Sequence, residues 1–405
     1  MSKANGAIEN KDTYLQHVSL KNYKSIKDAE IDFKPGLNII IGKNASGKTN
    51  FVNGLDNILN FNYDELLDIE FIIKARFHKY IVEIQALNKN QNAEDILKND
   101  YHHFSVNHDM LFKINGEQIE INYYEELFSA LIKRDLFFIK VLIKYGVFYN
   151  ETAQFINLPF SFILINNRRI SSELLRVFSK NGGTRFIQGF FQQLYLYISK
   201  SFHFDDMIDN MDLKNKIISF SEQHFQNLND LISKFIPIQA IRLNPDFNII
   251  KEEESQKQTV TNFYLEFLID QNWLPFHLLS DGTQRLFYVI SEMLATYDNP
   301  IDNNELPIIL LEEPELGIHP HQLHQLMQFI KEQSREKQII LTTHSPQVLD
   351  VLEPDELDRV IICHYDSKKG TQLRHLTEKE INKAKKYMKD DFLSDYWRFS
   401  NLEPA

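Results

Sequence analysis

Cysteine is almost absent from this chain: among 405 residues there is one, Cys363. A single thiol excludes a disulfide within the chain and a metal site built from several thiolates. Such cysteine usage is typical of proteins in a reducing compartment, so we expect a cytoplasmic protein.

Long apolar runs are also missing. The most apolar stretch, Leu136 to Phe148, is interrupted by lysines, and the first residues, MSKANGAIENKD, lack the apolar centre of a signal peptide. We therefore expect no membrane-spanning segment and no membrane partner. Residues 1–13 are predicted to form a flexible leader.

Positive charge is in deficit, with 44 Lys and Arg against 56 Asp and Glu and a formal net charge of -12. This excludes a surface coated with basic residues for general nucleic-acid binding, although a local basic groove stays possible in principle. One basic run surrounds Asn181-Gly182-Gly183. It consists of Arg168, Arg169, Arg176, Lys180 and Arg185, and it either contacts DNA phosphates or forms a solvated face.

The N-terminal part of the chain has the pattern of a sheet interrupted by one helix. Residues 15 to 41 read as a strand pair, a Pro35-Gly36 turn and a buried strand, and residues 48 to 59 have helical apolar spacing. Residues 68 to 122 read as short strands with an Asn115-Gly116 turn. We expect an N-terminal lobe over 14–124.

The middle and the end of the chain differ in pattern. Long helical runs predict a helical insertion over 125–235, and from 280 onward helices alternate with two buried strands. Residues 236–405 are therefore predicted to form a C-terminal lobe. The two ends together predict one α/β fold.

A glycine-rich segment, GKNASGKT, follows the first buried strand and opens the first helix. Its glycines permit close backbone approach, its amides and the helix N-terminus attract phosphate, and its lysine and threonine suit the β- and γ-phosphates and Mg²⁺. A chance glycine-rich turn is the alternative, which the flanking strand and helix disfavour. The residues predicted to bind ATP are Gly42, Lys43, Asn44, Ala45, Ser46, Gly47, Lys48 and Thr49.

Two further segments follow buried strands. Glu312 and Glu313 end the strand at 308 to 311, and we expect Glu312 to join Thr49 in the Mg²⁺ shell and Glu313 to polarise the attacking water. His344 follows the strand at 338 to 341 and is predicted to sense the γ-phosphate. The alternatives are a solvated acidic pair and a structural histidine.

A second helix start resembles a phosphate site. It follows Leu279 and carries a hydroxyl, a flexible glycine and a positive helix end, in Ser280, Asp281, Gly282 and Gln284. One nucleotide does not need two such sites on one chain. We therefore expect this segment of each chain to contact the ATP that a second copy binds, in a dimer or a higher oligomer.

In order, the segments 42–49, 280–285, 312–320 and 344–346 resemble the Walker A, signature, Walker B and switch-histidine motifs of ABC-class ATPases. The sequences NYKSI, LSDGTQR, EEPELGIHP and TTHSP are similar to the chromosome-repair branch, related to RecF and SMC, and to the overcoming-lysogenization-defect (OLD) family. The resemblance implies that the N- and C-terminal lobes form one ABC-type P-loop NTPase head with a mixed sheet, and that ATP is held between two protomers. Glu312 in place of the usual aspartate and the extra charge of Asp281 predict slow hydrolysis.

The resemblance also implies a cellular role. OLD-like nucleases carry a TOPRIM domain with an Asp-x-Asp pair, which the residues after His344 lack, so we expect no intrinsic nuclease. The chain then resembles ATPase subunits of bacterial anti-phage systems that control a separate nuclease or toxin. The alternative is a repair or chromosome-maintenance ATPase that acts on DNA directly; a transporter subunit is disfavoured.

Three assignments are left open. The metal-contacting glutamine of this class is not identified among Gln85, Gln118 and Gln154, each of which is otherwise an ordinary surface residue. Tyr23 lies near adenine, in the core or on the surface. The aromatic face of the insertion either binds the effector or forms the insertion's own core. That face consists of Phe186, Phe190, Phe191, Leu194 and Tyr195.

Overall fold

The computed structural model describes residues 13–60, 69–77, 80–88, 108–119, 137–143, 160–165, 169–170, 189–190, 193–194, 197, 209–251, 257–295 and 305–400. The chain forms two compact units. The first comprises Met1–Leu142, Asn299–Glu315 and Leu323–Ala405, and the second comprises Ile143–Asp298 and Leu316–Gln322. Each unit is described by itself.

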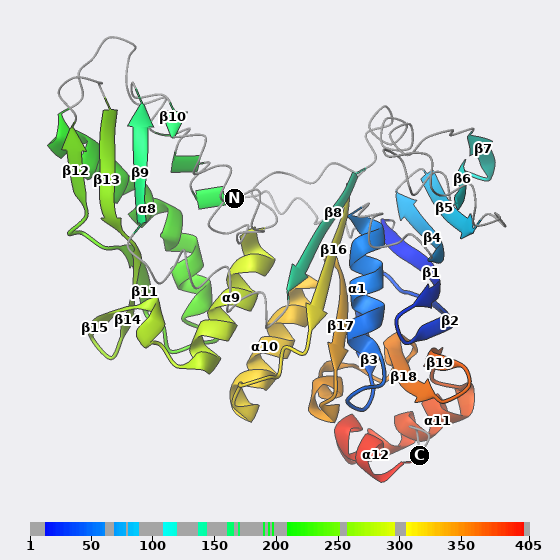
Figure 1. Ribbon diagram of the computed structural model, residues 1–405. Coiled ribbons are helices and arrows are strands. Elements are labelled where there is room, and N and C mark those ends of the chain that lie inside the picture. Colours follow the sequence, from blue (N-terminus) through cyan, green and yellow to red (C-terminus); the bar gives the residue numbers. More distant parts are fainter. Residues whose placement is uncertain are drawn as a thin grey trace, which may run out of the picture. The chain divides into compact units, whose positions relative to one another are not determined.

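A twelve-stranded mixed sheet dominates the first unit (Figure 1), in the order β7-β6-β5-β4-β1-β2-β19-β18-β3-β17-β16-β8. The sheet thus joins strands from both ends of the chain, as the sequence predicts. Its strands are β1 (Tyr14–Tyr23), β2 (Ile26–Asp32), β3 (Leu37–Ile41), β4 (Glu70–Phe77), β5 (Tyr80–Asn88), β6 (His108–Ile114), β7 (Glu117–Ile119), β8 (Phe137–Ile143), β16 (Glu305–Glu312), β17 (Gln338–Thr343), β18 (Val360–Asp366) and β19 (Gly370–His375).

The centre of this sheet is parallel. β3 pairs with β17 and β18, and β17 pairs with β16, all in the parallel sense. Every residue of β3 and β17 is buried, which explains their continuous apolar sequences, because both faces of a parallel sheet are usually covered. The register sets Ile41 beside Thr343 and Thr342 beside Glu312, so three strands end at one edge.

The rest of the sheet is antiparallel, and the helix α1 (Lys48–Leu59) packs with it in one core. β4 alternates between half-buried and buried residues, the pattern of a strand with one solvated face. The helix buries Phe51, Val52, Leu55, Ile58 and Leu59 in a cluster with residues of β1, β4 and the parallel strands. The predicted strand pair, buried strand and helix are confirmed here.

Helices complete the C-terminal part of the first unit. They are α10 (Pro320–Gln333), whose first residues belong to the second unit, the short turns η5 (Pro346–Val351) and η6 (Leu357–Arg359), α11 (Glu378–Tyr387) and α12 (Leu393–Phe399). A capping box of Thr377 and Glu380 starts α11. The Ser394 backbone N–H donates to Asp350 at 2.8 Å, which ties α12 to η5.

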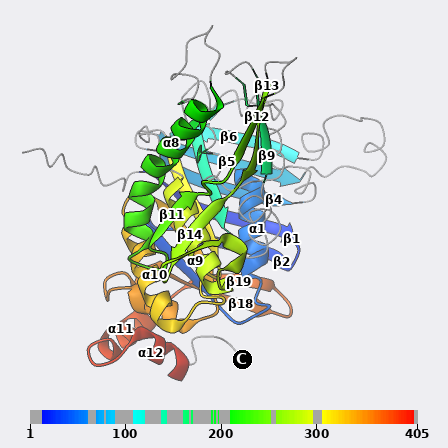
Figure 2. The ribbon, with the colours of Figure 1, turned by 90° about the vertical axis from the view of Figure 1, so that its left-hand side faces the viewer.

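The second unit holds two smaller antiparallel sheets with helices (Figure 2). One sheet has the order β10-β9-β13-β12, and the other β11-β14-β15. Helix α8 contacts β11, β12 and α9. The elements are β9 (Phe160–Ile165), β10 (Arg169–Ile170), α8 (Asn210–Ile232), β11 (Ala240–Leu243), β12 (Asn248–Lys251), β13 (Lys257–Phe263), β14 (Leu265–Ile269), β15 (Asn272–Pro275), η4 (Phe276–Leu278) and α9 (Asp281–Ala295).

The helical insertion expected over 125–235 contains strands as well as a helix. Helix α8 lies within it, but so do the strands β8, β9 and β10. The sequences of β8 and β9, FFIKVLI and FSFILI, are short apolar runs rich in aromatic and β-branched residues, and periodicity alone does not separate such a strand from a buried helix. β9 pairs with β13, a partner about a hundred residues away, which local patterns do not reveal.

Of the helices within the described ranges, none combines the length and the apolar character that a bilayer crossing requires.

The buried Lys337, which precedes β17, makes stability depend on pH. Burial lowers the pKa of its ammonium group from 10.5 to about 7, and its residue is 5% exposed. Between these pKa values the unfolded chain binds the proton and the folded chain does not, so stability rises with pH. We expect the unfolding free energy, measured with urea, to rise from pH 7 to about pH 9.5 by about 2–3 kcal/mol from this group.

In Lys337→Met this part of the rise should disappear, and the variant should be more stable than the parent at pH 7. Lys369→Met, at an exposed lysine of the same unit, is the matched control and should keep the parental slope. An unchanged slope in Lys337→Met would contradict the assignment.

Candidate functional site

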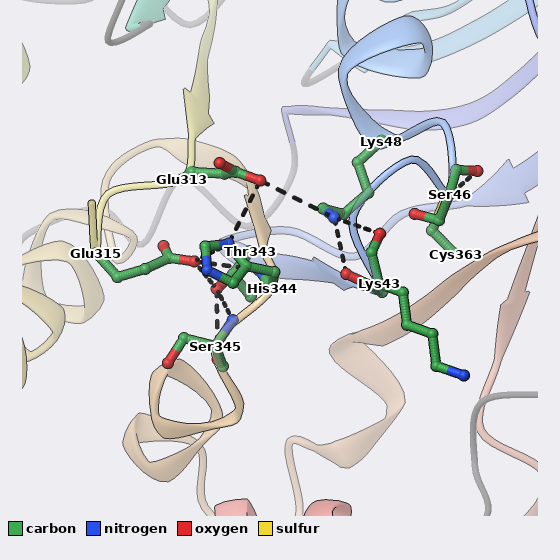
Figure 3. A network of polar contacts seen from close by, with 10 residues as sticks. Lys43, Ser46, Lys48, Glu313, Glu315, Thr343, His344, Ser345 and Cys363 are labelled. Carbon is green, nitrogen blue, oxygen red and sulfur yellow. Dashed lines mark hydrogen bonds and ion pairs between the residues drawn. The ribbon is translucent and has the colours of Figure 1, made fainter.

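Three loops meet at the carboxyl edge of the parallel strands (Figure 3). They follow β3, β16 and β17 and begin at Gly42, Glu313 and His344. Backbone hydrogen bonds continue the sheet into these loops: Gly42 N–H donates to the Thr343 carbonyl at 3.3 Å, and Glu313 N–H donates to the Thr342 carbonyl at 2.8 Å. Segments far apart in sequence are thereby fixed against one another.

The loop from Gly42 to Thr49 is shaped to receive an anion. Gly47 is the N-cap of α1, with φ of 102°, and contributes no side-chain cap; the first turn of the helix contains no acidic residue. The amides at such a helix start are unsatisfied within the helix and attract negative charge. Asn44, Ala45 and Thr49 are exposed at this loop, whereas Ser46 is buried.

Glycine is required at two positions of the loop. A Cβ atom on Gly42 would lie 2.1 Å from the Cys363 carbonyl oxygen, and one on Gly47 would lie 1.9 Å from Thr371 Oγ1. Cys363 also donates its thiol proton to the Ser46 carbonyl at 3.5 Å. The strands β18 and β19 therefore form a floor against which the loop backbone packs.

The Lys48 side chain folds back over this loop. Lys48 is 4% exposed, and its Nζ donates to the carbonyls of Gly42 at 2.7 Å and Lys43 at 3.0 Å. Nζ also lies 4.0 Å from Glu313 Oε1. The ammonium group is thus held at the mouth of the loop, beside the acidic residues, while the Lys43 side chain points away from it (Figure 3).

Glu313 and His344 meet beside Lys48. Glu313 has φ of 43°, a left-handed conformation that residues with side chains rarely adopt, and it turns the chain immediately after the strand. Its Oε1 atom lies 3.5 Å from His344 Nδ1. The structure therefore brings together Lys48, Glu313 and His344, which lie on three separate segments of the sequence. Such strained backbone is often found at functional sites.

Sequence reasoning missed one member of this cluster, Glu315. Its carboxylate accepts from Thr343 Oγ1 at 2.5 Å and from the His344 backbone N–H at 3.1 Å, and it lies 3.3 Å from His344 Nδ1. Glu315 lies within the segment EEPELGIHP, but it does not end a strand and no sequence periodicity sets it apart from the other acidic residues. Only the folded loop shows that it faces His344.

The residues present fit a magnesium nucleotide better than a metal held by protein alone. The Thr49 side chain is exposed at the start of α1, and the half-buried Glu312 ends β16. Within the described ranges no group of three or more His, Cys, Asp or Glu residues is arranged to hold a metal ion. Mg²⁺ characteristically takes one or two protein oxygens and completes its shell with water and substrate phosphates.

The second predicted phosphate site opens α9 in the second unit. Ser280 Oγ accepts from the Thr283 backbone N–H at 3.2 Å and so caps the helix. Ser280 and Asp281 are exposed and Gly282 is half-buried. A Cβ atom on Gly282 would lie 2.6 Å from the Gly317 carbonyl oxygen, so this turn packs closely on the segment that follows the acidic pair.

Gln284 does not belong to the exposed part of that turn. Its residue is 8% exposed, and its amide donates to the carbonyls of Leu279 at 2.9 Å and Phe276 at 3.2 Å. Gln284, which was predicted to belong to the second phosphate site, therefore stabilises this turn through its buried amide. The residues of this turn that are accessible to a ligand are Ser280, Asp281 and Gly282.

The structure bears on two of the open assignments, Tyr23 and the metal-contacting glutamine. Tyr23 is buried, and its ring packs beside Gly54, so it belongs to the core. Gln85 bonds the Glu83 carboxylate on its own strand, Gln118 is exposed on β7, and Gln154 lies outside the described residues. The metal-contacting glutamine therefore stays unassigned.

The surfaces predicted to bind partners are only partly described. Phe190 and Leu194 are buried, and the Phe190 ring stacks on Phe225 with centroids 5.2 Å apart, which confirms the core interpretation for these two residues. Phe186, Phe191 and Tyr195 lie outside the described residues. Of the basic run, the backbone of Arg169 is described in β10; Arg168, Arg176, Lys180 and Arg185 also lie outside.

The chain is similar to known ATPase and DNA-processing proteins. The family model described as "AAA ATPase domain" matches residues 14–349. Endonuclease GajA of Bacillus cereus strain VD045 is 22% identical over 91% of this chain, which spans 63% of that relative's length, less than two thirds. The DNA replication and repair protein RecF of Streptococcus agalactiae serotype Ia is 48% identical over 42 residues, 10% of this chain.

Solved structures show the fold. An SMC head bound to the C-winged helix domain of ScpA matches with a TM-score of 0.50 and 16% identity, covering 91% of this chain and 99% of the other. An SMC head with an extended coiled coil, from Pyrococcus furiosus, matches with a TM-score of 0.50 and 14% identity over 93% and 100%. The chain therefore has an SMC-head-like ABC ATPase fold with a large mixed sheet, as the sequence predicts.

The contact between Gly47 and Thr371 can be tested against a matched glycine. We expect Gly47→Ala to weaken binding of a fluorescent ATP analogue about tenfold or more, or about 1.4 kcal/mol. It should also destabilise the fold by about 1–3 kcal/mol beyond the control, because the added methyl group has no space.

Gly116→Ala is that control, since Gly116 also has positive φ, 84°, but has nothing within 4 Å of the added atom. It should show the backbone strain without loss of nucleotide affinity. Equal effects of the two substitutions in equilibrium binding and urea unfolding would show that the contact does not matter.

Proposed function

The chain belongs to the AAA ATPase domain family, and from this premise we propose that it binds ATP with Mg²⁺ and hydrolyses it in a dimer of two copies. The observation that carries the proposal is the convergence of Lys48, Glu313 and His344 at the ends of three parallel strands. A cation, a carboxylate and an imidazole beside an anion-binding helix start suit phosphoryl transfer to water.

Each ATP would be bound by a half-site from one copy, made of Gly42 to Thr49, Glu312, Glu313 and His344, and completed by a second copy. The amides from Gly42 to Thr49 hold the phosphates, and Lys48 exchanges carbonyl contacts for the β- and γ-phosphate oxygens. Thr49 and Glu312 hold Mg²⁺, which when bound neutralises charge on the phosphates. No donor other than oxygen is needed, in agreement with the preferences of this ion.

Glu313 is the residue that orients the attacking water. Its carboxylate lies between Lys48 and His344, where a water in line with the γ-phosphate is reached from the strand end. His344 contacts the phosphate being transferred and responds to its release. Because Glu312 is longer than the usual aspartate and Asp281 adds negative charge, we expect turnover below about 10 per second, the median for enzymes.

The second copy supplies Ser280, Asp281 and Gly282. This exposed turn opens α9 and presents a helix N-terminus and a hydroxyl, which suit a phosphate that its own chain does not require. ATP then closes two copies on each other, and hydrolysis reopens them. Higher oligomers built from such dimers are compatible with this scheme.

Substituting the water-orienting residue should separate binding from hydrolysis. We expect Glu313→Gln to bind ATP with Mg²⁺ but to lose hydrolysis by about 10²-fold or more, within the range for a general base. It should accumulate as a closed dimer in size-exclusion chromatography with light scattering. Adding Ser280→Arg to this variant should restore the monomer without abolishing ATP binding.

Two results would refute this scheme. One is a parental hydrolysis rate in Glu313→Gln, and the other is an ATP-dependent dimer that Ser280→Arg leaves intact. Thermal unfolding of each variant shows whether the fold is retained, because Ser280→Arg also removes a helix cap that contributes about 1 kcal/mol.

For the cellular role, we propose a sensor and regulatory subunit of a bacterial anti-phage system that controls a separate effector, either a nuclease or a toxin. Two features support this: the similarity to an endonuclease over most of this chain, and the resemblance of its motifs to OLD-like ATPases. The second unit carries the exposed turn of α9 and would report closure to the effector.

A repair or chromosome-maintenance ATPase acting directly on DNA is the second candidate. The short similarity to RecF and the basic run around residues 168 to 185 favour it. In this case the basic run would contact phosphates, and binding would weaken steeply with salt. Both candidates use the same half-site and differ only in what the ATPase cycle controls.

A binding experiment distinguishes the two roles. In the effector role, we expect the chain to co-purify with the product of a neighbouring nuclease or toxin gene, whose activity changes with ATP and in Glu313→Gln. In the DNA role, the chain alone should bind duplex DNA with strong salt dependence. That binding should be lost when Arg168, Arg169 and Arg176 are changed to Glu.

A further inference from the structure

A buried carboxylate that sequence analysis did not assign lies behind His344. Glu315 is 9% exposed as a residue, and its side chain 6%. It belongs to the loop after β16, whereas Thr343 ends β17 and His344 begins the loop that follows. It therefore connects two of the three loops that form the half-site, as Figure 3 shows.

One oxygen of Glu315 receives all the contacts. Oε1 accepts from Thr343 Oγ1 at 2.5 Å and from the His344 backbone N–H at 3.1 Å. His344 Nδ1 lies 3.3 Å from the same atom. The other oxygen, Oε2, is buried and has no hydrogen-bond partner among the described residues. Burying a half-satisfied carboxylate costs free energy, which suggests a function for it.

The contacts determine where the imidazole carries hydrogen. A backbone N–H can only donate, so Oε1 acts as an acceptor whatever the protonation of Oε2. His344 Nδ1 faces this acceptor and also Glu313 Oε1, at 3.5 Å. A ring nitrogen without hydrogen would be repelled by both oxygens. Nδ1 is therefore the protonated nitrogen, and Nε2 is the one available for a ligand.

We propose that Glu315 is a positioning residue for the ATP hydrolysis inferred above, on which this role rests: it fixes His344 in the form with hydrogen on Nδ1. In the neutral ring Nε2 then accepts a hydrogen bond, and in the protonated ring it donates to a phosphate oxygen. Partners of this kind orient catalytic and metal-binding histidines in other proteins.

Glu315 also leaves the Glu313 carboxylate available to orient the attacking water. The two carboxylates approach the same nitrogen, and Glu315 is the nearer. With the Nδ1 hydrogen directed towards the nearer Glu315 carboxylate, Glu313 would be left to orient water. Without Glu315, Glu313 becomes the only acidic partner of Nδ1 in this cluster, and its position relative to the phosphate changes.

Hydrolysis kinetics test this coupling through a double-mutant cycle. We expect Glu315→Gln to lower kcat about tenfold with KM for ATP changed less than twofold, the scale for residues that orient a functional histidine. In a His344→Ala background the same substitution should have less than about a twofold effect, because its partner is gone. Equal effects in both backgrounds would refute the proposal.

Glu353→Gln is the matched control. It removes the same charge from a side chain that is 70% exposed and paired with Lys331, and it should leave kcat unchanged. Glu315→Asp, which keeps the charge but shortens the side chain, should retain more activity than Glu315→Gln. Thermal unfolding shows whether the Glu315 variants fold.

Nuclear magnetic resonance of protein labelled with ¹⁵N-histidine tests the same claim without activity. The His344 signal, assigned by its loss in His344→Ala, should have hydrogen on Nδ1 in the parent and should change in Glu315→Gln. A parental His344 protonated on Nε2 alone would overturn the inference. If the parent does not hydrolyse ATP, the proposed function fails, while this spectrum still decides the role of Glu315.

Discussion

The parallel register of β16, β17 and β3 is the constraint on which the rest of the site depends. Setting Ile41 beside Thr343 and Thr342 beside Glu312 brings three strand ends together. Glu313 and His344 then follow their strands directly, and Lys48 reaches the same point from the start of α1, after the loop that follows β3. A register shift in any of these strands would turn its side chains to the other face and separate Lys48, Glu313 and His344.

The floor beneath the phosphate-binding loop is a second constraint, and it comes from a distant part of the chain. β18 and β19 approach the loop so closely that side chains are excluded at two of its positions. Thr371, at the start of β19, also accepts or donates in a hydroxyl pair with Ser25 at 2.7 Å. The loop is thus shaped by the C-terminal strands as well as by its own glycines.

Much of this was predictable because the motifs combine local chemistry with local structure. A strand, a glycine-rich loop and a helix are consecutive at 37–59, so one window of sequence defines them. The strands β8 and β9 were misread because their pairing partners are remote. The contacts of Glu315 and Gln284 could not be predicted, because both side chains are buried and motif spacing does not reveal which way a side chain faces in a loop.

The chain passes from the first unit to the second immediately after Glu315. Glu315, which contacts His344, is therefore next in the chain to the segment that contains Gly317. The α9 turn packs on that segment at Gly282. Only Leu316 separates Glu315 from Gly317 in the sequence. The acidic loop beside His344 and the support of the α9 turn therefore share one short stretch of backbone, and a substitution that alters the backbone at Leu316 would disturb both.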